Sequence, residues 1–163
     1  MKVLNLPSLV SLYNFLLLRV IMYWEEAIEI IKHNQCPPPY QYKDGTLKTS
    51  FLRVDECPPK FKKIIDEYHN KYNLKDIQLF ASLGQSEGIG EHSDPCNVLI
   101  ICLEGEMAYS VERSPLVVLR AGDTLYIKNG LRHLPVSYTT PRICLSVEVL
   151  NEVPREEVTY YFG

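Results

Sequence analysis

Short apolar runs dominate the sequence after Asn73 and constrain its fold more than any other feature. Each run is six to eight residues long, is rich in Val, Ile, Leu and Tyr, and is followed by Gly, Ser or Pro residues. Runs of this length and spacing are typical of β-strands in a sandwich or barrel. We therefore predict a mainly β core with strands at residues 76–83, 97–103, 106–112, 115–120, 123–128 and 142–149.

The first part of the chain, residues 1–75, has the pattern of helices instead. One helix begins near Trp24 and stops before the Pro37-Pro38-Pro39 run, which cannot continue a helix. Cys57-Pro58-Pro59 opens a second helix, and we expect a short strand at residues 49–54 before it. The expected buried face of this second helix consists of Phe61, Ile64, Ile65, Tyr68 and Tyr72. We expect residues 1–75 to pack on a barrel of residues 76–163 as a single domain, because 163 residues are one domain's worth.

Residues 1–24 are apolar enough to suggest a signal peptide or a membrane anchor, but their details favour neither. Arg19 and polar residues spaced three apart interrupt the apolar stretch, and no small-residue cleavage site follows it. We expect a helix that packs on the barrel or on a second subunit, which makes it a candidate homodimer contact. An alternative is that the natural start is Met22.

Charge and cysteine content exclude several classes of partner. The net charge of −3 and the pI near 5.8 give no basic surface for nucleic acid. The five cysteines include no CxxC pair, and their number is odd. This usage suits a reducing compartment and predicts a cytoplasmic protein. With the charge and the interrupted apolar stretch, we expect no direct nucleic-acid partner and no membrane contact.

Three residues within the β region form a candidate metal site. In an extended strand His92 and Asp94 point to the same face, and His133 can supply a third ligand. Two histidines and one carboxylate are the facial ligand set of non-haem Fe(II) oxygenases, which leave positions open for substrate and dioxygen. The alternative for the first pair is a surface His-Ser-Asp turn. The other candidate ligands are weaker. His33 and His69 lie in helical segments and Asp123 follows a glycine at a turn, so we expect structural roles for them.

The motifs around these residues resemble the cupin superfamily. Gly122, Gly130 and His133 have the spacing of the second cupin motif, within GDTLYIKNGLRH. The first motif keeps His92 and Gly105 but has Asp94 at its second histidine and Val98 at its glutamate. His-x-Asp followed by an apolar strand resembles the JmjC-type, ribosomal-oxygenase-like Fe(II)- and 2-oxoglutarate-dependent hydroxylases. The resemblance covers residues 76–149 and implies a double-stranded β-helix, with N-terminal helices before it, and Fe(II), 2-oxoglutarate and dioxygen at the site.

The expected co-substrate site departs from that family. Many JmjC-type enzymes hold the far carboxylate of 2-oxoglutarate with a basic residue where this chain has Met107, which should point inward together with Tyr109. In other 2-oxoglutarate oxygenases an arginine after the last metal histidine takes this carboxylate. Arg142 stands nine residues after His133, with Cys144 in the place of an assisting serine. We therefore assign Arg142, Cys144 and Tyr109 to the co-substrate site, with a solvent-facing Arg142 as the alternative.

The sequence predicts a hydroxylase whose substrate, a protein or a small molecule, has no signature in the chain. Two alternatives stay open: a metal-binding cupin that does not use 2-oxoglutarate, and a non-catalytic cupin that binds a ligand or serves in assembly. Catalysis by Cys96, Cys102 or Cys144 is disfavoured, because a thiol beside apolar strands packs as a small hydrophobe and its pKa rises.

Overall fold

The computed structural model describes residues 46–51, 59–82, 89–137 and 141–163. The helix predicted within residues 1–24, the helix that begins near Trp24, and His33 lie outside the described residues. No helix among the described residues has the length and apolar content needed to cross a membrane.

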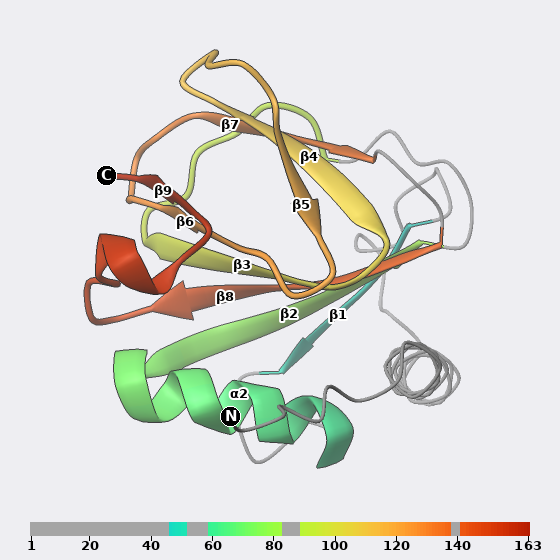
Figure 1. Cartoon of the computed structure of the whole chain (residues 1–163), viewed down its shortest axis with the longest axis vertical. Coiled ribbons are helices and arrows are strands. Elements are labelled where there is room, and N and C mark those ends of the chain that lie inside the picture. Colours follow the sequence, from blue (N-terminus) through green and yellow to red (C-terminus); the bar gives the residue numbers. More distant parts are fainter. Residues whose placement is uncertain (1–45, 52–58, 83–88, 138–140) are drawn as a thin grey trace, which may run out of the picture.

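Two β-sheets face each other and form the body of the molecule (Figure 1). The larger has six strands in the order β1 (Thr46–Phe51), β2 (Leu74–Ser82), β8 (Arg142–Val149), β3 (Asn97–Glu104), β6 (Thr124–Ile127) and β9 (Tyr160–Phe162). The smaller has the order β5 (Val117–Arg120), β4 (Glu106–Val111) and β7 (His133–Ser137). All pairs are antiparallel except β6 with β9. This arrangement is the mainly β, double-stranded β-helix class that the sequence predicts.

The six-stranded sheet is buried on both faces, which explains why its central strands are apolar at consecutive positions. In β3, Leu99 and Ile101 belong to the core between the sheet and helix α2 (Pro59–Tyr72), whereas Ile100 and Cys102 belong to the core between the two sheets. Alternating side chains of a strand point to opposite faces, so the same strand contributes residues to both cores, the outer one beneath α2 and the inner one between the sheets. Only the inner layer can contribute residues to a site inside the barrel.

Helix α2 covers the outer face of the large sheet (Figure 1). Phe61, Ile65 and Tyr72 are buried against it, as the helical spacing predicts. The helix ends at Tyr72, and the next residue, Asn73, has a left-handed φ of 54°. The backbone N–H of Leu74 donates to Nδ1 of His69 at 3.1 Å. His69 is therefore a structural residue at a helix end, because its ring nitrogen satisfies the chain as it leaves the helix.

A short 3-10 helix near the C-terminus, η2 (Arg155–Glu157), is hydrogen-bonded to the end of α2. Glu157 accepts hydrogen bonds from the hydroxyl of Tyr72 and from Nζ of Lys71. These two hydrogen bonds hold the pKa of the Glu157 carboxyl below its usual value.

All six predicted strands are present, with ends displaced by a few residues, and the strand expected at 49–54 is found at 46–51. β7 and β9 were not predicted. β7 contains Pro135 and follows directly on a turn, and β9 has only three residues, so neither has the alternating pattern that identifies a strand.

Candidate metal centre

A pair of backbone hydrogen bonds brings the two candidate histidines together. The N–H of His92 donates to the carbonyl of His133 at 3.0 Å, and the N–H of His133 donates to the carbonyl of His92 at 2.7 Å. Residues bonded in this way form an antiparallel bridge and present their side chains on the same side. The two imidazole centroids are 4.2 Å apart.

Asp94 completes the group from a loop rather than from a strand. We expected His92 and Asp94 on one regular strand, but β3 begins only at Asn97 and His92 has a single bridge. The carbonyl of Asp94 accepts a hydrogen bond from the N–H of Gly130 at 2.9 Å, where a φ of 78° makes the tight turn. Thus Gly130 of the second motif fixes the carboxylate loop of the first.

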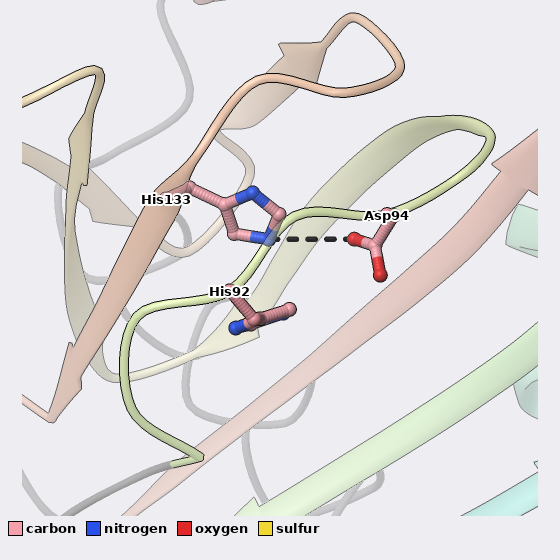
Figure 2. A group of neighbouring side chains, drawn as sticks. All are labelled: His92, Asp94 and His133. Carbon is pink, nitrogen blue, oxygen red and sulfur yellow. Dashed lines mark ion pairs between the residues drawn. The ribbon is translucent and has the colours of Figure 1, made fainter.

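The three side chains converge on a small volume (Figure 2). One ligand atom from each of His92, Asp94 and His133 lies within 4.8 Å of the others, and Nε2 of His133 is 3.4 Å from Oδ2 of Asp94. Ligand atoms held about 2.1 Å from one metal ion are at most about 4.2 Å apart. The group therefore needs little movement to surround an ion.

Both imidazoles are oriented as metal ligands. Nδ1 of His92 lies 3.0 Å from the carbonyl oxygen of Gly90, and Nδ1 of His133 lies 3.1 Å from that of Leu131. A carbonyl only accepts, so Nδ1 of each ring donates, and the neutral tautomer that this hydrogen bond selects has its lone pair on Nε2. Such a second hydrogen bond is the usual support of a metal-binding histidine. This donor chemistry fits a divalent ion held by two nitrogens and one carboxylate oxygen.

A charged pair ties together the segments that carry the two histidines. Nη2 of Arg132 contacts Oε2 of Glu91 at 2.6 Å, so the residue before His133 holds the residue before His92. The backbone N–H of Arg132 also donates to Glu112 at 2.6 Å. These contacts restrict the ligand loop at the surface, above the buried His133.

The metal group opens into a cavity of about 180 Å³ between the two sheets. Its wall includes all the residues that the sequence assigns to metal or co-substrate: His92, Asp94, Tyr109, His133, Arg142 and Cys144. Met107 also lines it, so this side chain points inward as expected and brings no charge to the cavity. Apolar side chains of Phe80, Ile89, Ile100 and Pro135 supply most of the remaining surface.

Arg142 is a buried cation of this wall and not a solvent-facing residue, since only 6% of it is exposed. Its position depends on Gly105, where a Cβ atom would lie 2.3 Å from the carbonyl oxygen of Pro141 and 3.1 Å from Cα of Arg142. Because Gly105 also has a φ of 71°, the close approach of the two segments requires glycine. Nη1 of Arg142 donates to Sγ of Cys144 at 3.9 Å.

Tyr109 presents a neutral phenol to the same cavity. The residue is 5% exposed, and burial raises the pKa of its hydroxyl well above the usual value. Its ring centroid is 6.4 Å from that of His133. A protonated hydroxyl in this place is a hydrogen-bond donor for an anionic ligand.

Sequence reasoning missed Gln78, and it placed Ser146 on the same strand face as Arg142 without assigning it to the site. The two residues stand opposite each other on β2 and β8 and line the cavity. Their alternation with buried apolar neighbours was the available signal. Together with Asp94 they also line a second cavity of about 210 Å³, which continues to Asp76, Cys96 and Glu148. The two cavities thus meet at a candidate metal ligand.

The remaining chemical candidates have structural roles. Oδ2 of Asp123 accepts the N–H of Arg120 at 2.8 Å and stabilises the turn between β5 and β6, as expected. Burial raises the pKa of the Cys96 thiol to about 11 and that of Cys102 to about 12, and it also raises the pKa of Cys144. The described cysteines are therefore thiols at neutral pH, which disfavours cysteine catalysis.

The solved structures similar to this chain include cupins and RmlC-like cupins. A cupin 2 conserved barrel domain protein from Leptotrichia buccalis is 16% identical, with a TM-score of 0.47 over 67% of this chain and 43% of that chain. An RmlC-like cupin from Methanocaldococcus jannaschii is 19% identical, with a TM-score of 0.42 over 45% of this chain and 68% of that one. A structure of Fe(II) HppE is 14% identical, with a TM-score of 0.39 over 45% and 41% of the two chains.

No protein-family model matches the sequence, and no curated protein matches it significantly. The similarities to solved structures concern the barrel and carry no conclusion about activity.

Proposed function

We propose that this protein is a non-haem Fe(II) oxygenase that uses 2-oxoglutarate as its co-substrate to hydroxylate a substrate. One observation supports the proposal above others: two imidazoles and a carboxylate converge on a cavity whose wall also holds a buried guanidinium. A metal centre and a separate buried cation in one small cavity suit a ligand with two acidic ends.

His92, Asp94 and His133 would hold the metal ion from one side. His133 is buried, whereas His92 and Asp94 are half-buried, so the open side of the group faces the cavity. Bound Fe(II) would supply activation of dioxygen, which a three-residue facial ligand set permits by leaving coordination positions open. The chain itself holds the ligands and keeps both ring protons on Nδ1.

Arg142 would bind the far carboxylate of 2-oxoglutarate. A buried carboxylate needs a charged partner, and a guanidinium can grip it with two parallel hydrogen bonds. The protonated hydroxyl of Tyr109 would donate a further hydrogen bond. Met107 would pack against the methylene groups between the two acidic ends, in place of the basic residue of the family.

The apolar part of the wall would keep bulk water from the reacting centre. The second cavity shares Gln78, Asp94 and Ser146 with the first and offers room for the substrate to be hydroxylated. Co-substrate and substrate would then occupy neighbouring cavities that share one candidate metal ligand.

The test is a titration of 2-oxoglutarate into the Fe(II)-loaded protein under nitrogen, followed by the metal-to-ligand absorption band. Removal of one partner from a buried charged pair costs about 3 to 5 kcal/mol. The substitution Arg142→Ala should therefore weaken binding on the order of a hundred- to several-thousand-fold. Arg120→Ala is the matched control, because Arg120 is exposed and pairs with Glu106 away from the cavity.

Succinate formation in air, measured separately, tests turnover. Binding that Arg142→Ala leaves unchanged would place the carboxylate elsewhere. Absence of binding in a protein that does take up metal would favour a cupin that does not use 2-oxoglutarate, or a ligand-binding module.

A further inference from the structure

Two buried cysteines stand directly opposite each other beneath the cavity. Cys102 of β3 and Cys144 of β8 are register partners in the antiparallel ladder. Both side chains belong to the core between the two sheets, where Cys102 is 1% and Cys144 2% exposed. Both are free thiols.

Their placement is compatible with a disulfide. Directly opposed residues of an antiparallel pair have Cα atoms about 4.5 or 5.5 Å apart. Disulfides span Cα distances of about 4.4 to 6.8 Å. The ladder also changes register between Cys102 and Glu104, so the backbone beside the pair is irregular and can adjust locally.

The two thiols differ in access. Cys144 lines the cavity, whereas Cys102 does not and has its Sγ 3.7 Å from the carbonyl oxygen of Glu104 and 3.6 Å from that of Gly105. A small oxidant that enters the cavity therefore meets Cys144 first, with Cys102 behind it as the second thiol. The raised pKa of both groups keeps them as thiols at rest and makes the first step slow.

We propose that Cys102 and Cys144 form a reversible cross-strand disulfide when a peroxide enters the cavity, and that this bond weakens ligand binding at Arg142. The first half stands on the geometry of the pair alone. The second half rests on the function proposed above, in which Arg142 binds a carboxylate.

The chemistry balances with hydrogen peroxide as the oxidant. Sulfur of Cys144 attacks one peroxide oxygen, the O–O bond breaks, and the products are a sulfenic acid and one water. Sulfur of Cys102 then attacks sulfur of Cys144, so that the S–S bond forms and the S–O bond breaks. The released hydroxyl takes the thiol proton of Cys102 and leaves as the second water. Two thiols are oxidised, one peroxide is reduced, and the chain loses two hydrogens.

The link to Arg142 is a direct contact. Nη1 of Arg142 donates to Sγ of Cys144 at 3.9 Å, and a bond to Cys102 pulls that sulfur toward β3. Gly105, three residues after Cys102, packs on the backbone of Arg142. Oxidation therefore removes one support of the guanidinium and shifts another.

The experiment treats the folded full-length protein with hydrogen peroxide, blocks remaining thiols, and maps peptides by mass. We expect a Cys102–Cys144 linked peptide with the loss of two hydrogens, its reversal by dithiothreitol, and an unchanged circular dichroism spectrum. Cys96→Ser is the matched control and should still form the bond. Cys102→Ala should instead stop at a Cys144 sulfenic acid that dimedone traps. Absence of the linked peptide from the folded wild-type protein overturns the proposal. This measurement requires neither metal nor 2-oxoglutarate.

The second readout is 2-oxoglutarate binding to the oxidised and reduced Fe(II)-loaded proteins under nitrogen. Loss of one weak hydrogen bond to a charged group predicts an affinity lower on the order of five-fold after oxidation. If oxidised and reduced proteins bind 2-oxoglutarate equally well, and Arg142→Ala does weaken that binding, the proposal that the disulfide regulates binding is overturned. If Arg142→Ala also has no effect, the proposed function fails while the disulfide stands.

Discussion

At the scale of single residues, the ring nitrogens of the two histidines decide how the candidate site can act. Each Nδ1 is engaged by a carbonyl two residues earlier in the chain, and this leaves each Nε2 as a ligand. The orientation arises from local backbone geometry. It needs no partner from another element.

His92→Ala should therefore abolish tight metal uptake. It removes a ligand atom, so the loss of affinity should exceed the roughly 10- to 100-fold that outer hydrogen-bond partners of a metal typically contribute. The measurement is metal content after anaerobic reconstitution with Fe(II) and gel filtration. His69→Ala is the control, because His69 caps helix α2 away from the site. Equal uptake by wild type and His92→Ala would remove the metal centre.

Gly105 is the residue on which the position of Arg142 depends most. Gly105→Ala places a Cβ against Pro141 and Arg142 at a left-handed φ, and should lower the free energy of unfolding by about 2 kcal/mol or more. Gly122→Ala is a matched control, since Gly122 has a φ of 96° but nothing within 4 Å of an added Cβ. Urea unfolding compares the two, and 2-oxoglutarate binding should weaken for Gly105→Ala alone. Equal losses in both variants would mean that crowding at Gly105 is unimportant.

At the scale of elements, the site depends on how two segments distant in sequence are joined. The bridge between His92 and His133 and the pair of Glu91 with Arg132 connect the ligand loop to the start of β7. The loop contributes little core, so these contacts determine its geometry.

Glu91→Gln should lower metal affinity while hardly changing stability. The pair with Arg132 is largely exposed, and such pairs contribute about 0 to 1 kcal/mol to folding. Its loss frees the loop that carries His92 and Asp94, so metal affinity should fall on the order of ten-fold, as for other outer partners. Glu106→Gln breaks a comparable pair with Arg120 away from the site. Calorimetric metal titration should separate the two, and identical affinities would limit Glu91 to a surface role.

These elements also mark how far sequence reasoning extends. Strand positions were predictable because the large sheet is apolar on both faces and its runs are bounded by glycines with left-handed φ, as at Gly105 and Gly122. The convergence of His92, Asp94 and His133 was predictable from motif spacing. The bridge between His92 and His133 was not, because pairing between distant segments leaves no local pattern. Gln78 and Ser146 alternate with apolar neighbours, but that pattern does not tell which face of a strand lines the cavity.

At the scale of the whole molecule, the barrel keeps its two cores on opposite faces of one sheet. Helix α2 covers the outer core (Figure 1). The cavity is lined by residues of the inner core. A change at the end of β3, next to Gly105, therefore affects the stability of the fold and the cavity wall together. Glu104 is a buried acid at this end, 5% exposed.

Stability should fall as the pH rises through the titration of Glu104. Burial raises the pKa of its carboxyl from 4.5 to about 7, so between these values the folded chain holds a proton that the unfolded chain has lost. The unfolding free energy then decreases with pH, by up to about 3 kcal/mol, and the decrease ends above pH 7. Glu104→Gln cannot ionise and should lack this decrease. Urea unfolding of both proteins from pH 4.5 to 8, with a chelator to keep the histidine ligands in the same metal-free state, gives the difference directly. Parallel curves would show that Glu104 is hydrated or paired in the folded protein, and the buried end of β3 would then be open to water.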